Sequence, residues 1–219
     1  MDTPCPPAVD VRVVDAIGLR RPHKSASAVA KPGYADRLAS TAFGAPSLPL
    51  WCLWIEPLPS EPDRWSQRWL SGVEAALSSW SSLLPVRRVN DPTQAQIFVW
   101  RQRPPRRQTP SGWRASNGRS QFKIRELTRA GQRRREPFIE VLISPGQRES
   151  ALQATALHEL GHAFGLWAHS PNNGDALAPF QAGEPVLVPS SADRTTLDWL
   201  RSQPSQFGDL AEPGPEPGA

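Results

Sequence analysis

The stretch HELGHAFGLWAH, at residues 158–169, holds three of the four histidines of this 219-residue chain. The preceding residues 149–157 (ESALQATAL) are rich in alanine and leucine and lack proline, which favours a helix that continues to residue 164. Gly165 ends this helix, because a residue without a Cβ adopts the left-handed conformation at low cost. His158 and His162 then lie one helical turn apart on the same face, where two imidazoles can bind a single ion.

Glu159 follows His158 directly and therefore lies about 100° around the helix from it. This displacement disfavours Glu159 as a ligand, but it lets the carboxylate reach a water molecule on the metal, where a catalytic base is needed. A catalytic zinc ion takes three protein ligands and keeps one position open. The sequence therefore predicts one catalytic Zn²⁺, with His158 and His162 as two of its ligands and Glu159 as the base.

The third ligand is expected from the residues that follow the helix. His169 is favoured, because the chain reverses at Gly165 and residues 165–168 are long enough to lead back to the metal. Imidazole nitrogen also suits zinc better than a lone loop carboxylate. Asp175 and Glu184 stay open as alternative third ligands, although a turn residue and a loop carboxylate are their ordinary interpretations.

The hydrophobic pattern of the rest of the chain predicts further strands and helices. Tryptophans and aliphatic residues recur at spacings of three and four in residues 62–84, which indicates a helix with Ser60 as its cap. Ser190 and Asp193 have the spacing of a capping box before a last helix. The predicted elements are, in order, a strand at 50–56, the helix at 62–84, strands at 86–89, 96–101, 121–128 and 138–144, the helix at 149–164 and a helix at 192–202.

Length and proline content bound the domain organisation. A chain of 219 residues is long enough for one domain with a hydrophobic core and short for two. Its 25 prolines mark tails and long loops. We expect a largely irregular N-terminal extension at residues 1–46 with one short strand, a catalytic domain at 47–207 and a disordered tail at 208–219.

The two cysteines, Cys5 and Cys52, are too few for the disulfide framework of a small secreted scaffold. Cys5 is interpreted as an ordinary cysteine of a tail, and the redox compartment stays open. No apolar run approaches the roughly 18 residues of a membrane span, and the first 30 residues lack the apolar stretch of a secretory signal. We therefore expect a soluble monomer, cytoplasmic by default, with export left open.

The net charge of +4 is unevenly distributed. Residues 101–135, which begin at Arg101 and end at Arg135, hold eleven arginines and one lysine against Glu126 alone, a net charge of +11. A field of one sign raises the local concentration of the opposite charge, which favours an acidic partner. The ordinary interpretation of such a segment is a solvated and partly mobile loop.

A function of a different class also stays open. In that alternative the chain is a basic module that binds nucleic acid or an anionic surface, and its metal site is vestigial. Glu159 discriminates between the two functions, because a binding module has no need of a catalytic base. Trp100 and Trp113 are also too sparse among the arginines to form a stacking platform.

Residues 158–170 resemble the metzincin metallopeptidases, and among them the matrixin-like branch, whose pattern HExxHxxGxxH is often followed by serine, here Ser170. The helix and loop are similar to those of a group of predicted cyanobacterial zinc proteases. The resemblance covers roughly residues 48–207, and it implies a zinc-dependent endopeptidase that hydrolyses protein or peptide substrates. It also implies an α+β fold with a twisted mixed sheet of about five strands, a long N-terminal helix, an active-site helix and a C-terminal helix. In the family the substrate pairs with an antiparallel edge strand, which corresponds to residues 121–128.

Two departures from the family pattern bear on the site. His169 lies eleven residues after the first histidine instead of ten, so that Ala168 occupies the usual ligand position. The family also places a methionine in a tight turn beneath the metal, whereas the only methionine here is Met1. Leu177 stands in its place, and Pro179 matches the proline that follows. Leucine conserves the volume of methionine, at a typical cost under about 1.5 kcal/mol, so we expect the turn to form.

Overall fold

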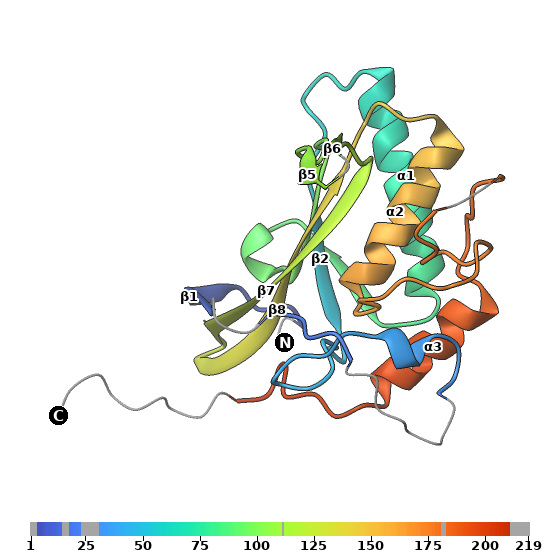
Figure 1. Cartoon of the computed structure of the whole chain (residues 1–219). Coiled ribbons are helices and arrows are strands. Elements are labelled where there is room, and N and C mark those ends of the chain that lie inside the picture. The colour runs from blue at the N-terminus through green and yellow to red at the C-terminus, as the bar shows by residue number, and fades with distance from the viewer. Residues whose placement is uncertain (1–3, 15–17, 23–30, 111, 181–182, 211–219) are drawn as a thin grey trace.

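A twisted mixed β-sheet lies at the centre of the fold, and two long helices cover one of its faces (Figure 1). The computed structural model describes residues 4–14, 18–22, 31–110, 112–180 and 183–210. Within these residues the sheet has six strands, in the spatial order β1 (Ala8–Val14), β7 (Gly118–Arg129), β8 (Gln132–Ile143), β4 (Ile97–Trp100), β2 (Trp51–Ile55) and β3 (Val86–Val89). β8, β4, β2 and β3 run parallel, whereas β7 is antiparallel to β8 and β1 is antiparallel to β7. The predicted α+β class with a mixed sheet is confirmed, and β1 is the short strand expected in the N-terminal extension, here joined to the same sheet.

The β7–β8 hairpin is longer than the two strands predicted for it, because the arginines around its turn find partners. Glu126 on β7 accepts hydrogen bonds from Arg133 and Arg135 on β8, at 3.1 and 3.0 Å. Since these pairs offset the repulsion between the arginines, the strands continue where the charge had suggested a loop. A second departure from the expected loop is a two-stranded ribbon formed by β5 (Arg107–Thr109) and β6 (Gly112–Arg114).

The helices α1 (Arg64–Ser81) and α2 (Glu149–Ala163) pack against each other and against the sheet (Figure 1). The indole nitrogen of Trp69 donates to the carbonyl of Ile143 at 3.0 Å, and that of Trp80 donates to the carbonyl of Leu157 at 2.9 Å. Both tryptophans are fully buried, so the apolar stripe of the predicted helix is its core face. The cap of α1 is Asp63, whose carboxylate accepts from a backbone amide, and not the Ser60 that the sequence suggested.

Residues before position 47, expected as a largely irregular extension, contribute to the hydrophobic core beside the last helix. This helix, α3 (Ser191–Arg201), begins with the predicted capping box of Ser190 and Asp193. Tyr34 is buried against it, and its backbone amide donates to the hydroxyl of Thr196 at 3.1 Å. The short 3-10 helix η1 (Ala35–Arg37) continues this contact.

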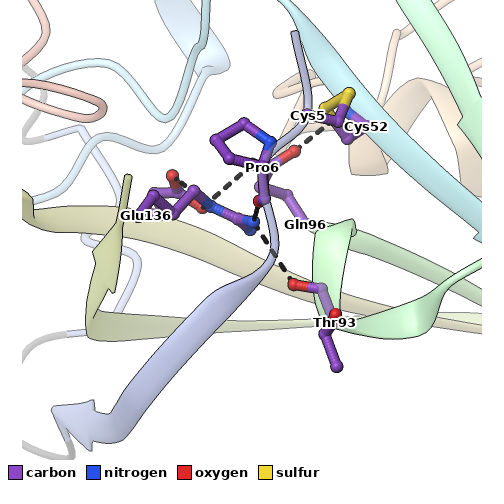
Figure 2. The surroundings of a disulfide bond; sticks show 7 residues. Cys5, Pro6, Cys52, Thr93, Gln96 and Glu136 are labelled. Carbon is purple, nitrogen blue, oxygen red and sulfur yellow. Dashed lines mark hydrogen bonds and ion pairs between the residues drawn. A yellow bond between two sulfur atoms is a disulfide. The ribbon is translucent and has the colours of Figure 1, made fainter. Parts of the chain in front are cut away.

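A disulfide bond joins Cys5 to Cys52, so the interpretation of Cys5 as an ordinary tail cysteine is wrong. Figure 2 shows that the bond lies beside a buried polar group. There the guanidinium of Arg129 donates to both carboxylate oxygens of Glu136, at 2.9 and 3.0 Å, and the amide of Gln96 donates to the same carboxylate at 2.9 Å. The two cysteines are 47 residues apart, and no local pattern in the sequence could have paired them.

Two expectations concern the ends and the apolar segments of the chain. Of the predicted tail at 208–219, residues 211–219 lie outside the described part. Residue 208 donates from its backbone amide to the carbonyl of Arg135 at 2.9 Å, so the tail begins in contact with the sheet. Among the described residues, none of the helices combines the length and the apolar character that crossing a bilayer requires.

Candidate metal centre

The helix α2 places His158 and His162 one turn apart on the face that looks away from the core. Their ring centroids are 4.7 Å apart, and their Nε2 atoms are separated by 3.1 Å. Two ligand nitrogens of a tetrahedral zinc ion are about 3.3 Å apart, since each lies about 2.0 to 2.1 Å from the metal. The pair therefore has nearly the spacing that a shared ion needs.

The end of α2 brings the third histidine to this pair. Gly165, with φ of 108°, donates to the carbonyl of His162 at 2.9 Å, and Leu166 donates to the carbonyl of Gly161 at 3.1 Å. These two bonds form a Schellman motif, which reverses the chain. A Cβ at position 165 would lie 2.6 Å from a side-chain carbon of Leu200, so this position requires glycine for space as well as for conformation.

His169 converges on the pair, as the sequence predicted. Its ring centroid lies 5.3 Å from that of His158 and 5.1 Å from that of His162, and the ligand atoms of the three side chains all lie within 4.8 Å of one another. Two overlapping three-residue turns precede His169 and accommodate the additional residue. In them the backbone amide of Trp167 donates to the carbonyl of residue 165, and that of Ala168 donates to the carbonyl of residue 166, both at 2.8 Å. Because His169 is the exposed member of the three, rotation of its side chain can shorten the remaining separation.

Backbone carbonyls fix the orientation of the two helix histidines. The Nδ1 atom of His158 lies 2.9 Å from the carbonyl oxygen of Ala176, and that of His162 lies 2.7 Å from the carbonyl oxygen of Leu166. A carbonyl can only accept, so each Nδ1 carries the proton and each Nε2 presents a lone pair to the other ring. Two lone pairs 3.1 Å apart repel each other unless a cation lies between them, which is the arrangement of a metal site.

The electrostatics of the cluster keep the imidazoles in the neutral form that binds metal. Burial lowers the pKa of His158 to about 4, although its hydrogen bond to Ala176 opposes the shift. Burial and the neighbouring His158 lower the pKa of His162 well below its ordinary value, and burial also lowers the pKa of His169. All three rings are therefore unprotonated at neutral pH, so a cation does not have to displace a proton.

Glu159 lies beside the cluster and is held by strand β7. The hydroxyl of Ser120 lies 2.7 Å from Oε2 of Glu159 and donates to it. Burial raises the pKa of Glu159 to about 7, although the hydrogen bond from Ser120 opposes this shift. At Gly118 a Cβ would lie 2.6 Å from Cγ of Glu159 and 2.7 Å from Oε1, so only glycine lets the carboxylate approach the strand. Sequence analysis missed Gly118 and Ser120, because Ser120 lies 39 residues before Glu159 and nothing near the two residues in the sequence marks them.

A β-turn lies beneath the cluster, where the family resemblance placed a methionine. The backbone amide of Ala178 donates to the carbonyl of Asp175 at 3.1 Å and closes the turn, with Leu177 inside it. Leu177 is fully buried, and a Cβ at Gly161 on the helix would lie 2.6 Å from its side chain. The turn has therefore formed with leucine, and Pro179 follows it at the surface.

Asp193, which the sequence predicted only as part of a helix cap, also supports this turn. Its carboxylate accepts from the amides of Ala176 and Leu177, at 2.8 and 3.4 Å, and from the hydroxyl of Tyr34 at 2.7 Å. The carboxylate is completely buried. Because the carbonyl of Ala176 orients His158, Asp193 is linked to the histidine cluster through one residue.

The alternative third ligands do not join the cluster. Within the described residues, the group of side chains that could hold a metal here comprises His158, His162 and His169. Asp175 is buried and accepts hydrogen bonds from Ser170 and from the side-chain amide of Asn172, so its carboxylate is engaged in the loop. Glu184 is exposed.

The cluster opens into a cleft of about 940 Å³ that β7 borders. The strand β1 pairs with the part of β7 between Ile124 and Arg129. On that side, residues 118–123 of β7 have no strand partner within the described part of the chain. Among the described residues, the edge of β7 that β1 leaves uncovered is therefore 118–123, and the expectation of an edge over 121–128 is corrected, because β1 covers positions 124–128.

No protein-family model matches the chain, and a comparison with curated proteins finds no significant relative. The functional argument therefore rests on the geometry of the cluster and on the cleft around it.

Proposed function

We propose that the protein is a zinc-dependent endopeptidase with the metzincin arrangement, of the matrixin-like type. The observation that carries the proposal is the convergence of three neutral imidazoles beside a buried carboxylate in an open cleft. Three nitrogen ligands with one side left open are typical of catalytic zinc, whereas structural zinc sites are closed by four protein ligands.

His158, His162 and His169 would hold the ion. When bound, zinc supplies a Lewis acid that activates water for attack on a peptide carbonyl and polarises that carbonyl. The proposal of zinc over a harder ion such as Mg²⁺ or Ca²⁺ rests on the donor set, since those ions take oxygen ligands.

Glu159 moves the proton in this proposal. A carboxyl group with a pKa near 7 is suited to both halves of the reaction, because it can accept a proton from water and then return it to the leaving amine. Ser120 binds Oε2, which leaves Oε1 as the atom that takes up the proton. Gly118 gives the carboxylate the space to hold this position.

The free edge of β7 binds the substrate backbone in this proposal. Residues 118–123 precede the part covered by β1, and Ser120 within them contacts Glu159. A peptide that pairs with this edge in the antiparallel sense would add a strand to the sheet, with affinity from main-chain hydrogen bonds.

The disulfide bond bears on the cellular compartment in which the protein folds. Disulfide bonds persist in oxidising environments and are rare in the cytosol. The Cys5–Cys52 bond therefore favours an oxidising compartment over the cytoplasm that was the default expectation.

Digestion of a denatured protein mixture tests the proposed activity, with the cut sites identified by mass spectrometry. Wild-type protein loaded with zinc is expected to cleave peptide bonds, and a chelator is expected to abolish cleavage. Glu159→Gln should bind zinc almost normally and lose at least about 100-fold in rate, the scale of general base catalysis. Undiminished cleavage by Glu159→Gln would contradict the mechanism, and absence of cleavage by the zinc-loaded wild type would contradict the function.

A further inference from the structure

Five arginine side chains line the cleft that contains the histidine cluster. They come from separate parts of the chain: two from the N-terminal region, two from the β5–β6 ribbon and one from β7, beside Ser120. In order they are Arg21, Arg37, Arg107, Arg114 and Arg119. Among the described residues that line the cleft, Glu159 is the one carboxylate, and the proposed mechanism assigns it to proton transfer. The wall of the cleft is therefore strongly positive.

Three arginines of the basic segment 101–135 pair with carboxylates that do not line the cleft. Arg129 binds Glu136, and Arg133 and Arg135 share Glu126. These ion pairs stabilise the β7–β8 hairpin. An acidic partner of the whole segment stays a prediction.

The arginines of the cleft differ from these three. Within the described residues, no carboxylate lies within 4 Å of the charged nitrogens of Arg21, Arg37, Arg107 or Arg119. Arg119 donates to the backbone carbonyl of Pro105 at 2.7 Å, which holds its guanidinium in place but does not neutralise it. Among the described residues, these four arginines thus add positive charge to the cleft without an ion-pair partner.

The β5–β6 ribbon places two of these arginines opposite each other. Arg107 and Arg114 are partners in the register of the ribbon, and their neighbours across it are Gln108 with Trp113. Side chains directly opposite in an antiparallel pair are about 5 Å apart at Cβ, so both arginines add positive charge to the same part of the cleft wall. Arginine also binds carboxylates through two parallel hydrogen bonds, which adds direction to the charge attraction.

We propose that the cleft selects peptide segments that carry aspartate or glutamate next to the bond to be cleaved. This inference rests on the proposed peptidase function and names the substrate class of the same site. A peptide is favoured over a nucleic acid because residues 118–123 of β7, beside the arginines, have no strand partner on the β1 side among the described residues, and a nucleic acid has no backbone that continues a sheet. Electrostatic attraction then acts on a chain that the strand edge already aligns.

Two arginines can be tested against two matched controls. Arg107 and Arg119 line the cleft, whereas Arg103 and Arg106 belong to the same segment and do not line it. The test pair is Arg107→Gln with Arg119→Gln, and the control pair is Arg103→Gln with Arg106→Gln. Both pairs remove the same net charge, so a difference between them reports position and not total charge.

The experiment measures kcat/KM on quenched fluorescent peptides that share one cleavage site and differ only in flanking glutamate, glutamine or lysine. At low salt the glutamate peptide should be cleaved at least about tenfold faster than the lysine peptide, and the ratio should fall towards one at about 0.5 M salt. The test pair should lower the ratio of glutamate-peptide to glutamine-peptide cleavage about fivefold. The control pair should leave all three peptides unchanged.

Binding to Glu159→Gln, measured by fluorescence anisotropy with the same peptides, separates this inference from the proposed function. If the wild type cleaves no peptide but the variant binds the glutamate peptide in preference, the peptidase proposal fails and the acidic selectivity stands. Equal cleavage and equal binding of the three peptides overturn the selectivity, as does a glutamate preference that survives in the test pair. Displacement of the glutamate peptide by a single-stranded oligonucleotide at lower concentration than by unlabelled peptide assigns the cleft to nucleic acid and also overturns it.

Discussion

Replacement of Asp193 by alanine is expected to destabilise the fold and the histidine cluster together. Its buried carboxylate accepts hydrogen bonds from the amides of Ala176, Leu177 and Ser190 and from the hydroxyl of Tyr34. A buried donor left without a partner costs about 1 to 3 kcal/mol, and such costs are not fully additive within one network. We expect the free energy of unfolding to fall by about 3 to 5 kcal/mol, a large share of the 5 to 15 kcal/mol of an ordinary domain.

The same substitution should weaken metal binding. Loss of the carboxylate frees the turn whose carbonyl orients the first histidine, and loss of such outer partners typically lowers metal affinity about 10- to 100-fold. Urea unfolding of the metal-free protein measures the stability, and zinc titration against a chromophoric chelator measures the affinity. Asp198→Ala is the matched control, because Asp198 is an exposed carboxylate on the same helix and its loss should change stability by less than about 0.5 kcal/mol. A loss below about 1 kcal/mol for Asp193→Ala, with zinc affinity unchanged, would refute the reasoning.

Three further substitutions test the cluster, the base and the charge network. His169→Ala should abolish tight zinc binding, whereas Glu184→Ala should keep about one zinc per chain, as measured by metal analysis after dialysis. The reverse result would replace the metzincin assignment by a glutamate-ligated site. Gly118→Ala should lower kcat at least about tenfold by displacing the catalytic carboxylate, with zinc content intact, whereas Gly146→Ala, where a Cβ meets nothing within 4 Å, should be silent in the same assay. Hydrogen bonds from arginines lower the pKa of Glu126 to about 2, and the bond from Arg12 on β1 has the largest effect. The ionised carboxylate of Glu126 therefore stabilises the folded protein fully above pH 4.5, and this contribution is lost as the pH falls from there towards 2. Glu126→Gln should lower the free energy of unfolding by about 1 to 2 kcal/mol at pH 7, and the difference should vanish near pH 2 in unfolding titrations.

The elements that position the site could be predicted because their patterns are local. The apolar period of residues 62–84, the composition of 149–164 and the capping box before α3 all depend on neighbours within a few positions. The same is true of the pair of histidines four residues apart. His169 could be placed beside them because a glycine at the right position reverses the chain.

What could not be predicted depends on contacts between distant segments. The hydroxyl of Ser120 and the missing side chain of Gly118 matter only because β7 passes beside α2, and neither residue has a distinctive setting in the sequence. The arginines after Ala130 looked like a loop, since the sequence does not show that Glu126 lies across the strand from them. The role of Asp193 in supporting the turn at residues 175–178 was hidden for the same reason.

The strand β1 also has a consequence for the solubility of the protein. Without it, β7 would present all of its twelve residues as an open sheet edge, which is a template for pairing with another molecule. β1 itself is a poor template, because its register shifts between Val9 and Arg12, where Asp10 adopts a positive φ of 53°. The N-terminal segment thus terminates the sheet and discourages self-association.

The Cys5–Cys52 bond links the residues just before β1 covalently to β2, and it closes a loop of 47 residues. A loop of this length contributes about 4 kcal/mol through the entropy of the unfolded chain. Reductant added during purification would break this bond and free β1 to detach, so that aggregation begins at the end of β7 nearest residue 129.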